Sequence, residues 1–96
     1  MASLEFDHIV TIHPRVSIRP EPFGALLYHF GTRQLSFLKD RRLLDIVRAC
    51  DGQRSLADAF AVADVTDAHT DRYRRAIETL VASSMLRVEA PSEVAA

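Results

Sequence analysis

Residues that often catalyse reactions or bind metals occur in this chain, but none shows the spacing that such sites need. The four histidines are scattered without an HxxxH pair on a helix, and Cys50 is the single cysteine. No GxSxG turn or glycine-rich phosphate loop is present. Asp64 and Asp67 lie in a polar connection, where capping a helix is a simpler role than moving protons. We therefore expect no enzyme activity, no catalytic residue, no metal site and no cofactor.

An arginine cluster, RYRR at residues 72–75, is the one candidate for binding a polyanion. It falls at the start of the third expected helix, where a winged-helix protein carries its recognition helix. Asp64, Asp67 and Asp71 surround this helix start, and the net charge of the chain is −1, so the charge does not favour phosphate binding. A solvated helix face is the simpler interpretation. We expect no nucleic acid partner, and a winged-helix DNA-binding transcription regulator is the alternative function.

Size and composition favour one small domain. A chain of 96 residues can bury a modest core, and its 48% hydrophobic content is that of an ordinary globular protein. The N-terminus lacks a basic segment followed by an apolar core, so it does not resemble a signal peptide. No apolar run approaches the ~20 residues of a membrane-spanning helix. We expect a cytoplasmic protein without a membrane partner.

Three strands are expected in the first half of the chain. After an N-terminal arm (residues 1–13), a short strand lies between Pro14 and Pro20, a second opens at Gly24, and a third follows the turn at residues 31–33. Three consecutive antiparallel strands form a meander. Alternation places these side chains together: Leu26, Tyr28 and Phe30 on one face of the second strand, Leu35 and Phe37 on one face of the third, and Gln34 and Ser36 on its other face.

Three helices are expected after the strands. The first starts at Asp40 as its N-cap and ends at Asp51-Gly52, and the second starts at Ser55, with Asp58 three residues later. The third has an inner stripe of Tyr73, Ala76, Ile77, Leu80, Val81 and Ser84. Residues 85–89 form either a final short strand or an extended end, and residues 90–96 a flexible tail. The sequence thus predicts an α+β domain over residues 14–89, with its helices on one face of a small sheet.

The third strand leaves an unprotected sheet edge. Its sequence QLSFL holds no proline, glycine or charge, whereas the first strand carries prolines and arginines that discourage edge pairing. An extended peptide could add to the open edge through main-chain hydrogen bonds. The alternative is that the third helix or the N-terminal arm covers it.

Three segments of the chain resemble a known family. RPEPFGALLYHFGTRQLSFL (residues 19–38), LLDIVRACDGQRSLADAF (43–60) and RRAIETLVASSML (74–86) are similar to the PqqD-like proteins. Among these, they are most similar to the small peptide chaperones of mycofactocin biosynthesis. The resemblance runs from about Pro14 to Val88.

The resemblance implies a winged-helix-like RiPP recognition element, which binds the leader of a ribosomally made precursor peptide. In such domains the leader adds to the third strand and lies against the third helix. The chaperone then presents the peptide to a radical S-adenosylmethionine maturase, and the iron–sulfur clusters belong to that enzyme. The partners implied are therefore the precursor peptide and the maturase. A homodimer stays open, because the N-terminal arm could pair within its own chain or with a neighbour.

The open edge and the resemblance together give a set of peptide-binding residues. Backbone groups would come from Gln34, Ser36 and Leu38 or from the residues between them, depending on the register. Arg74 and Arg75 could pair with acidic leader residues, although a solvated face is as good an interpretation. The floor of the site would be Leu35, Phe37, Tyr73, Ile77 and Val81, for which the alternative is an ordinary core position.

Overall fold

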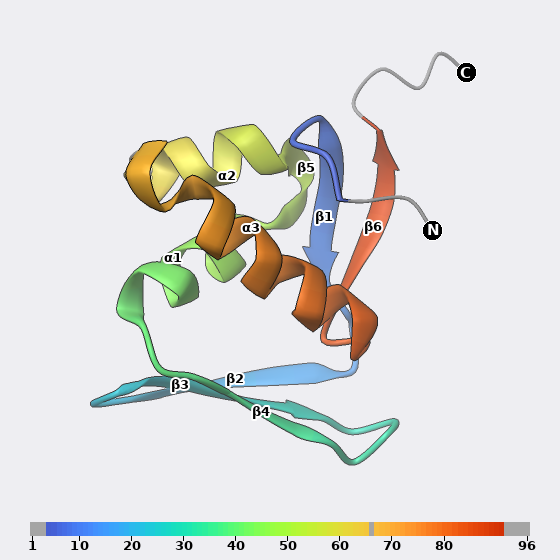
Figure 1. Cartoon of the computed structure of the whole chain (residues 1–96). Coiled ribbons are helices and arrows are strands. Elements are labelled where there is room, and N and C mark those ends of the chain that lie inside the picture. Colours follow the sequence, from blue (N-terminus) through green and yellow to red (C-terminus); the bar gives the residue numbers. More distant parts are fainter. Residues whose placement is uncertain (1–3, 66, 92–96) are drawn as a thin grey trace.

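The computed structural model describes residues 4–65 and 67–91 of the chain. These residues form two three-stranded antiparallel sheets and three helices, which confirms the predicted α+β class. The elements are β1 (His8–Ile12), β2 (Val16–Glu21), β3 (Gly24–His29), β4 (Leu35–Leu38), α1 (Arg41–Ala49), β5 (Asp51–Ser55), α2 (Leu56–Val62), α3 (Asp67–Ala82) and β6 (Leu86–Pro91). Figure 1 shows the helices grouped above the β2–β3–β4 sheet, with the β5–β1–β6 sheet standing beside them.

The β2–β3–β4 sheet is the meander that the sequence predicted, with β3 in its centre. Gly24 opens β3 with a φ of 148°, a conformation that other residues rarely adopt. A Cβ atom at this position would collide with the carbonyl oxygen of Leu38. Glycine therefore allows the start of β3 to lie directly against the end of β4.

The core lies between the upper face of this sheet and the helices. Ala25 and Leu27 of β3 and Leu38 of β4 are at most 1% exposed. They share one buried cluster with side chains from the helices and the other sheet, among them Val10, Ile46, Leu56, Ile77 and Leu86. The helices cover one face of the meander, as predicted, and none of the described elements covers its other face (Figure 1).

The β5–β1–β6 sheet is the part of the fold that the sequence did not predict. β1 comes from the expected arm and pairs with β5 on one side and β6 on the other. β5 has the sequence DGQRS, in which no hydrophobic alternation marks a strand. Residues 85–89 were predicted to form either a short strand or an extended end. The strand is correct, since most of this segment belongs to β6.

The predicted division into an arm of residues 1–13, a domain of residues 14–89 and a tail of residues 90–96 stays a prediction. Residues 8–12 of the arm form the central strand of the second sheet. Residues 90 and 91 belong to β6, and residues 92–96 lie outside the described part of the chain.

Two predicted helix caps are confirmed. Asp40 is the N-cap of α1, where its Oδ1 accepts hydrogen bonds from the backbone N–H groups of Arg42 at 2.8 Å and Leu43 at 3.4 Å. Ser55 is the N-cap of α2, and its hydroxyl accepts from the N–H of Asp58 at 3.2 Å. Such caps satisfy N–H groups that have no partner within the helix.

The predicted inner stripe of α3 runs too far, because Ser84 does not belong to the helix. α3 ends at Ala82, and Ser84 has a left-handed φ of 68°. The N–H of Met85 donates to the Leu80 carbonyl at 2.9 Å, and the N–H of Ser84 donates to the Val81 carbonyl at 3.0 Å. These are the two bonds of a Schellman motif, in which the left-handed residue is usually glycine.

Replacing this residue, Ser84→Gly, should stabilise the chain. Glycine avoids the penalty of about 1–2 kcal/mol for a left-handed side-chain-bearing residue. Glycine also raises the conformational entropy of the unfolded chain, which offsets part of this gain, so we expect the free energy of unfolding to rise by only about 0.5–1 kcal/mol. Urea unfolding would measure the change. Ser83→Gly is the matched control, because Ser83 lacks a positive φ and should lose stability. A gain at Ser83 equal to that at Ser84 would contradict the assignment.

Candidate binding site at the free edge of β4

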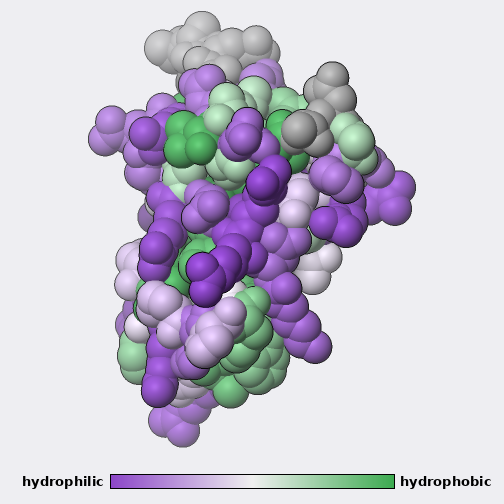
Figure 2. Space-filling model, turned by 90° about the vertical axis from the view of Figure 1, so that its left-hand side faces the viewer, coloured by the Kyte–Doolittle hydropathy of each residue, from purple (hydrophilic) through white to green (hydrophobic). Residues whose placement is uncertain are grey.

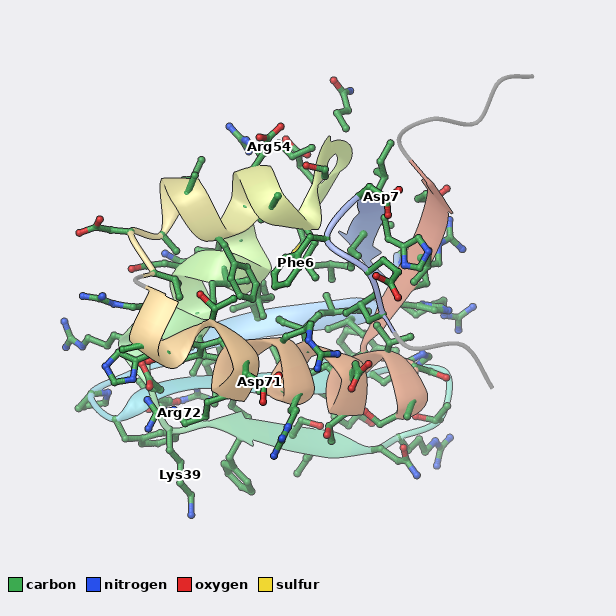
Figure 3. The ribbon with its side chains drawn as sticks, turned by 45° about the horizontal axis from the view of Figure 1, so that its top comes forward. Phe6, Asp7, Lys39, Arg54, Asp71 and Arg72 are labelled. Carbon is green, nitrogen blue, oxygen red and sulfur yellow. The ribbon has the colours of Figure 1, made fainter. Side chains whose placement is uncertain are left out.

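β4 is an open edge strand. In the described ranges 4–65 and 67–91 it pairs with β3 alone. The N-terminal arm does not cover this edge with residues 8–12, because they pair with β5 and β6 in the other sheet. Figures 1 and 3 show α3 running alongside β4 on its upper side, so that helix borders the edge. The outer edge of the same sheet on the opposite side is β2.

Hydrogen bonds at the end of β3 show which of its residues bond to β2 and which bond to β4. The N–H of His29 donates to the Gln34 carbonyl at 3.0 Å, and the N–H of Phe30 donates to the Arg15 carbonyl at 2.8 Å. His29 thus bonds toward β4, and Phe30 bonds toward β2. Because successive residues of a strand direct their backbone groups to opposite sides, residues 25 and 27 also bond to β4, and residues 24, 26 and 28 bond to β2.

The register then identifies the outward backbone groups of β4. Ser36 pairs with Leu27 and Leu38 with Ala25, so both direct their N–H and C=O groups toward β3. Leu35 and Phe37 therefore direct theirs away from the sheet. Two sets of backbone groups were predicted for the peptide: those of Gln34, Ser36 and Leu38, or those of the residues between them. The second set, Leu35 and Phe37, is the one that lies at the free edge.

The same alternation explains why the β2 edge is poorly suited to pairing. Pro20 pairs with Ala25, whose backbone groups face β4, so the backbone of Pro20 points outward. Proline has no N–H to offer at that position. The prediction that proline protects the first strand is thus correct for Pro20, and the two edges of the sheet are chemically different.

Asp40 links the end of β4 to α3. Its Oδ2 accepts a hydrogen bond of 2.6 Å from the Tyr73 hydroxyl and lies 3.5 Å from Nη2 of Arg72. The Arg72 guanidinium also lies 5.0 Å from the centre of the Tyr73 ring. One carboxylate therefore caps α1 and holds the first turns of α3 beside the chain that leaves β4.

These contacts shift two pKa values. Partial burial acts to raise the pKa of Asp40, but hydrogen bonds from Tyr73, Arg42 and Leu43 and the charge of Arg72 outweigh it, so the pKa lies below its usual value. Burial, followed by the hydrogen bond to Asp40, raises the pKa of Tyr73. At neutral pH the pair is thus a carboxylate that accepts from a protonated hydroxyl.

The structure divides the predicted floor into two groups. Leu35 and Phe37 are 53% and 59% exposed, on the face of the sheet opposite the core. Tyr73 and Ile77 are buried in the core, and Val81 packs against it while partly exposed. The core alternative is therefore correct for Ile77 and wrong for Phe37, and the five side chains do not form one continuous floor.

Arg74 and Arg75 are both held by salt bridges within α3. Arg74 pairs with Asp71 at 2.9 Å and with Glu78 at 3.0 Å, and Glu78 also accepts from the N–H of Leu4 at 2.8 Å. Arg75 pairs with Asp71 at 2.9 Å, and its side chain is 73% exposed. Of the two, Arg75 is the more accessible to an acidic ligand.

Sequence reasoning missed Arg72, the arginine of α3 that contacts the junction between β4 and α1. Figure 3 labels it near this junction, and its distance to Asp40 confirms the placement. Ala76 lies one turn further along the same side of α3 and is partly exposed. The sequence did contain a signal for Arg72. It directly precedes Tyr73, and the neighbour of a buried tyrosine lies beside the apolar stripe of the helix.

His29 shapes the turn that leads into β4. Its ring is 3% exposed, and its Nδ1 accepts from the N–H groups of Gly31 at 3.0 Å and Thr32 at 3.1 Å. Two backbone donors of the tight turn are thereby satisfied. Its Nε2 is buried without a hydrogen-bond partner among the described residues.

Cys50 is buried, and its chemistry follows from that burial. Burial raises the pKa of the Cys50 thiol to about 12, so the reactive thiolate is suppressed. Residues 4–65 and 67–91 contain no group of three or more histidine, cysteine, aspartate or glutamate side chains that could hold a metal ion. In the same ranges, no helix is long and apolar enough to cross a membrane.

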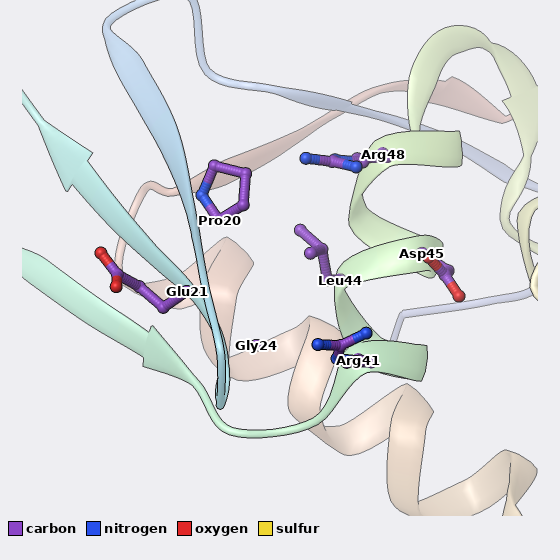
Figure 4. Close-up of a pocket in the computed structure, with 7 residues that line it drawn as sticks. All are labelled: Pro20, Glu21, Gly24, Arg41, Leu44, Asp45 and Arg48. Carbon is purple, nitrogen blue, oxygen red and sulfur yellow. The ribbon is translucent and has the colours of Figure 1, made fainter.

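A separate hollow of about 330 Å³ lies between the β2–β3 turn and α1 (Figure 4). Arg41, Leu44 and Arg48 point from α1 toward the strands, whereas Asp45 points away. Pro20 and Gly24 form part of the opposite wall. This hollow adjoins β2 and is therefore separate from the β4 edge.

Removing the carboxylate, as in Asp40→Ala, should destabilise the chain. Loss of an N-cap costs about 0.5–2 kcal/mol, and the buried Tyr73 hydroxyl loses its acceptor, so we expect a total loss of about 1–3 kcal/mol. Tyr73→Phe should lose less, because the cap remains. Urea unfolding of both single variants and the double variant would give the coupling between the two groups. Strictly additive losses would contradict a direct contact.

The pH dependence of stability should also report this contact. Because the pKa of Asp40 is lower in the folded chain than its ordinary value of 3.8, the ionised form stabilises the fold above that value. The stabilisation is lost as the pH falls through the lowered pKa. Asp40→Asn should therefore show a smaller stability deficit at pH 2 than at pH 6. An equal deficit at both values would argue against the shift.

Comparisons with known proteins identify the family. The model of the peptide chaperone MftB family matches residues 10–87, a range that holds every element from β2 to α3. The chain is 49% identical to peptide chaperone MftB of Mycobacterium tuberculosis over 75 residues, or 78% of this chain and 69% of that protein. It is 47% identical to peptide chaperone MftB of Mycolicibacterium smegmatis over 85 residues, 86% and 83% of the two chains. No solved structure matches the chain. The resemblance found in the sequence is confirmed, and the chain belongs to the peptide chaperone MftB family.

Proposed function

We propose that this chain binds the leader of a ribosomally made precursor peptide by adding it as a strand to β4. The observation that carries the proposal is the outward direction of the N–H and C=O groups of Leu35 and Phe37. An extended peptide can pair with both residues, and its side chains then meet those of β4. The names of the relatives, which are peptide chaperones, support a peptide as the ligand.

The main-chain bonds alone do not give a tight complex. Leu35 and Phe37 offer two donors and two acceptors, and four bonds at about 1 kcal/mol each contribute about 4 kcal/mol. A micromolar complex needs about 8 kcal/mol, beyond the free energy lost in ordering the peptide. Side-chain contacts must supply the difference, so the leader should be recognised by its sequence as well as by its backbone.

The ten residues proposed to bind the peptide would take different roles. Leu35 and Phe37 would bond to it, while the remaining residues of the strand, Gln34, Ser36 and Leu38, would hold the strand against β3. Tyr73 and Ile77 would fix α3 beside the edge from within the core. Side-chain contacts from α3 would come from Arg74, Arg75 and Val81.

We also propose that the chain presents its peptide to a radical S-adenosylmethionine maturase in the cytoplasm and has no turnover of its own. Binding the leader away from the reacting end raises the local concentration of the peptide at the enzyme. The iron–sulfur clusters would belong to the enzyme. The buried Cys50 and the names of the relatives support a non-catalytic role.

A proline at the edge should separate peptide binding from folding. Phe37→Pro removes an outward N–H without breaking a bond to β3, so the chain should fold and the affinity for the precursor peptide should fall at least tenfold. Ser36→Pro would instead remove a bond to β3 and weaken the fold. Calorimetry with the precursor peptide that is encoded next to the gene of this chain would measure the affinity. Circular dichroism would show whether the variant folds.

Phe37→Ala is the matched control, because it removes the side chain and keeps the N–H. If Phe37→Pro folds and binds as well as Phe37→Ala, the peptide does not add at this edge. If Phe37→Pro does not fold, methylating alternate backbone nitrogens of the leader tests the same hydrogen bonds from the other partner. A methylated leader that binds at full strength would equally exclude strand addition.

Duplex DNA should bind weakly and without specificity. Salt bridges to Asp40, Asp71 and Glu78 engage the arginines at the start of α3, which leaves little free positive charge for phosphates. A titration with random duplex DNA at low salt should show much weaker binding than the precursor peptide. Tight binding that falls steeply with added salt would favour the transcription-regulator alternative.

A further inference from the structure

Most of the exposed large apolar side chains lie on one surface of the molecule. Of the six in the described residues, Phe23, Phe30, Leu35 and Phe37 belong to the β2–β3–β4 sheet or its turns and are between 45% and 59% exposed. Leu26 and Tyr28 of β3 are partly exposed on the same face. Figure 2 shows hydrophobic side chains over the lower part of the molecule, where this sheet lies. We call the surface formed by these sheet residues the aromatic face; its members are Phe23, Leu26, Tyr28, Phe30, Leu35 and Phe37.

The strand register joins these side chains into one continuous surface. Leu26 is paired with Phe37 and Tyr28 with Leu35, and directly opposed residues project to the same side of a sheet. The Phe23 and Phe37 rings lie 6.2 Å apart, and the Tyr28 and Phe30 rings 4.8 Å apart. The buried residues Ala25, Leu27 and Leu38 alternate with them and project to the core. The aromatic face therefore lies on the side of the sheet that no described element covers.

Positive charge borders the aromatic face. Phe23, Phe37 and Lys39 line a hollow of about 370 Å³. Figure 3 shows Lys39 pointing away from the helices, and Arg33 is exposed in the turn between Phe30 and Leu35. Neither cation forms a salt bridge within residues 4–65 and 67–91, unlike most arginines of the chain. A complementary partner would be apolar, with carboxylates at its border.

The aromatic face is too small for a stable dimer of the free chain. An aromatic side chain buries about 150–250 Å² in full, so three half-exposed phenylalanines with Leu35 offer about 400 Å². A stable interface takes about 800 Å² from each partner. A fourth strand along β4 would enlarge this face, because alternate side chains of that strand lie beside Leu35 and Phe37.

We propose that the aromatic face, extended by the bound peptide strand, is the docking surface for the enzyme that modifies the peptide. This inference rests on the proposed function. The enzyme would contribute an apolar surface bordered by carboxylates and would contact both the chain and the peptide. It should therefore bind the loaded chain more tightly than the free chain, and by linkage it should tighten peptide binding by the same factor.

The experiment compares variants of the full chain by two separate affinities. Phe23→Ser and Phe30→Ser lie outside β4, so the affinity for the precursor peptide should stay within twofold of the unmodified chain. The affinity of the peptide-loaded chain for the maturase should fall at least tenfold. Val62→Ser is the matched control, because Val62 is also exposed (59%) but lies on α2. Lys39→Glu should weaken docking and reduce its dependence on salt.

Each outcome decides one question. Unchanged maturase affinity in both phenylalanine variants would overturn the docking surface, whereas absent peptide binding by the unmodified chain would overturn the proposed function itself. Loss of docking in Arg48→Glu alone would place the enzyme at the hollow beside α1 and exclude the aromatic face. A stable dimer that Phe30→Ser dissociates would assign the face to a second copy of the chain.

Discussion

The hydrogen bond between Tyr73 and Asp40 fixes the geometry on which the candidate site depends. It is 2.6 Å long and joins residues 33 positions apart, one at the end of the meander and the other within α3. Asp40 also caps α1, so the same carboxylate sets where the chain turns from β4 into the first helix. Asp40 therefore helps to hold α3 beside the end of β4, together with the buried side chains of α3 in the core.

The difference between the two edges of the meander follows from the alternation of the backbone. In a three-stranded sheet, every second residue of an outer strand has backbone groups with no partner inside the sheet. On β2 one of these positions is Pro20, whereas on β4 both are ordinary residues, Leu35 and Phe37. An edge of this kind attracts any extended chain, including further copies of the protein. β4 has only four residues, so the length of edge open to any such chain is short.

Local signals in the sequence predicted much of this fold. Turn residues and alternation located the meander, and the capping residues Asp40 and Ser55 located the starts of two helices. β5 could not be predicted, because its polar residues owe their strand conformation to pairing with β1. The core alternative for Phe37 was wrong for a related reason: alternation gives two faces, and only tertiary packing decides which face the helices cover. The contact between Arg72 and Asp40 could not be predicted either, because it depends on how α3 packs beside the end of β4.

One strand can therefore serve two partners, because its backbone and its side chains point in perpendicular directions. The N–H and C=O groups of Leu35 and Phe37 lie in the plane of the sheet, and their side chains project from the sheet on the side away from the core. A peptide that pairs with the backbone leaves these side chains accessible and adds its own beside them. A protein that docks on the face would then detect the peptide by contacting the added side chains, without any change in the fold of the chain.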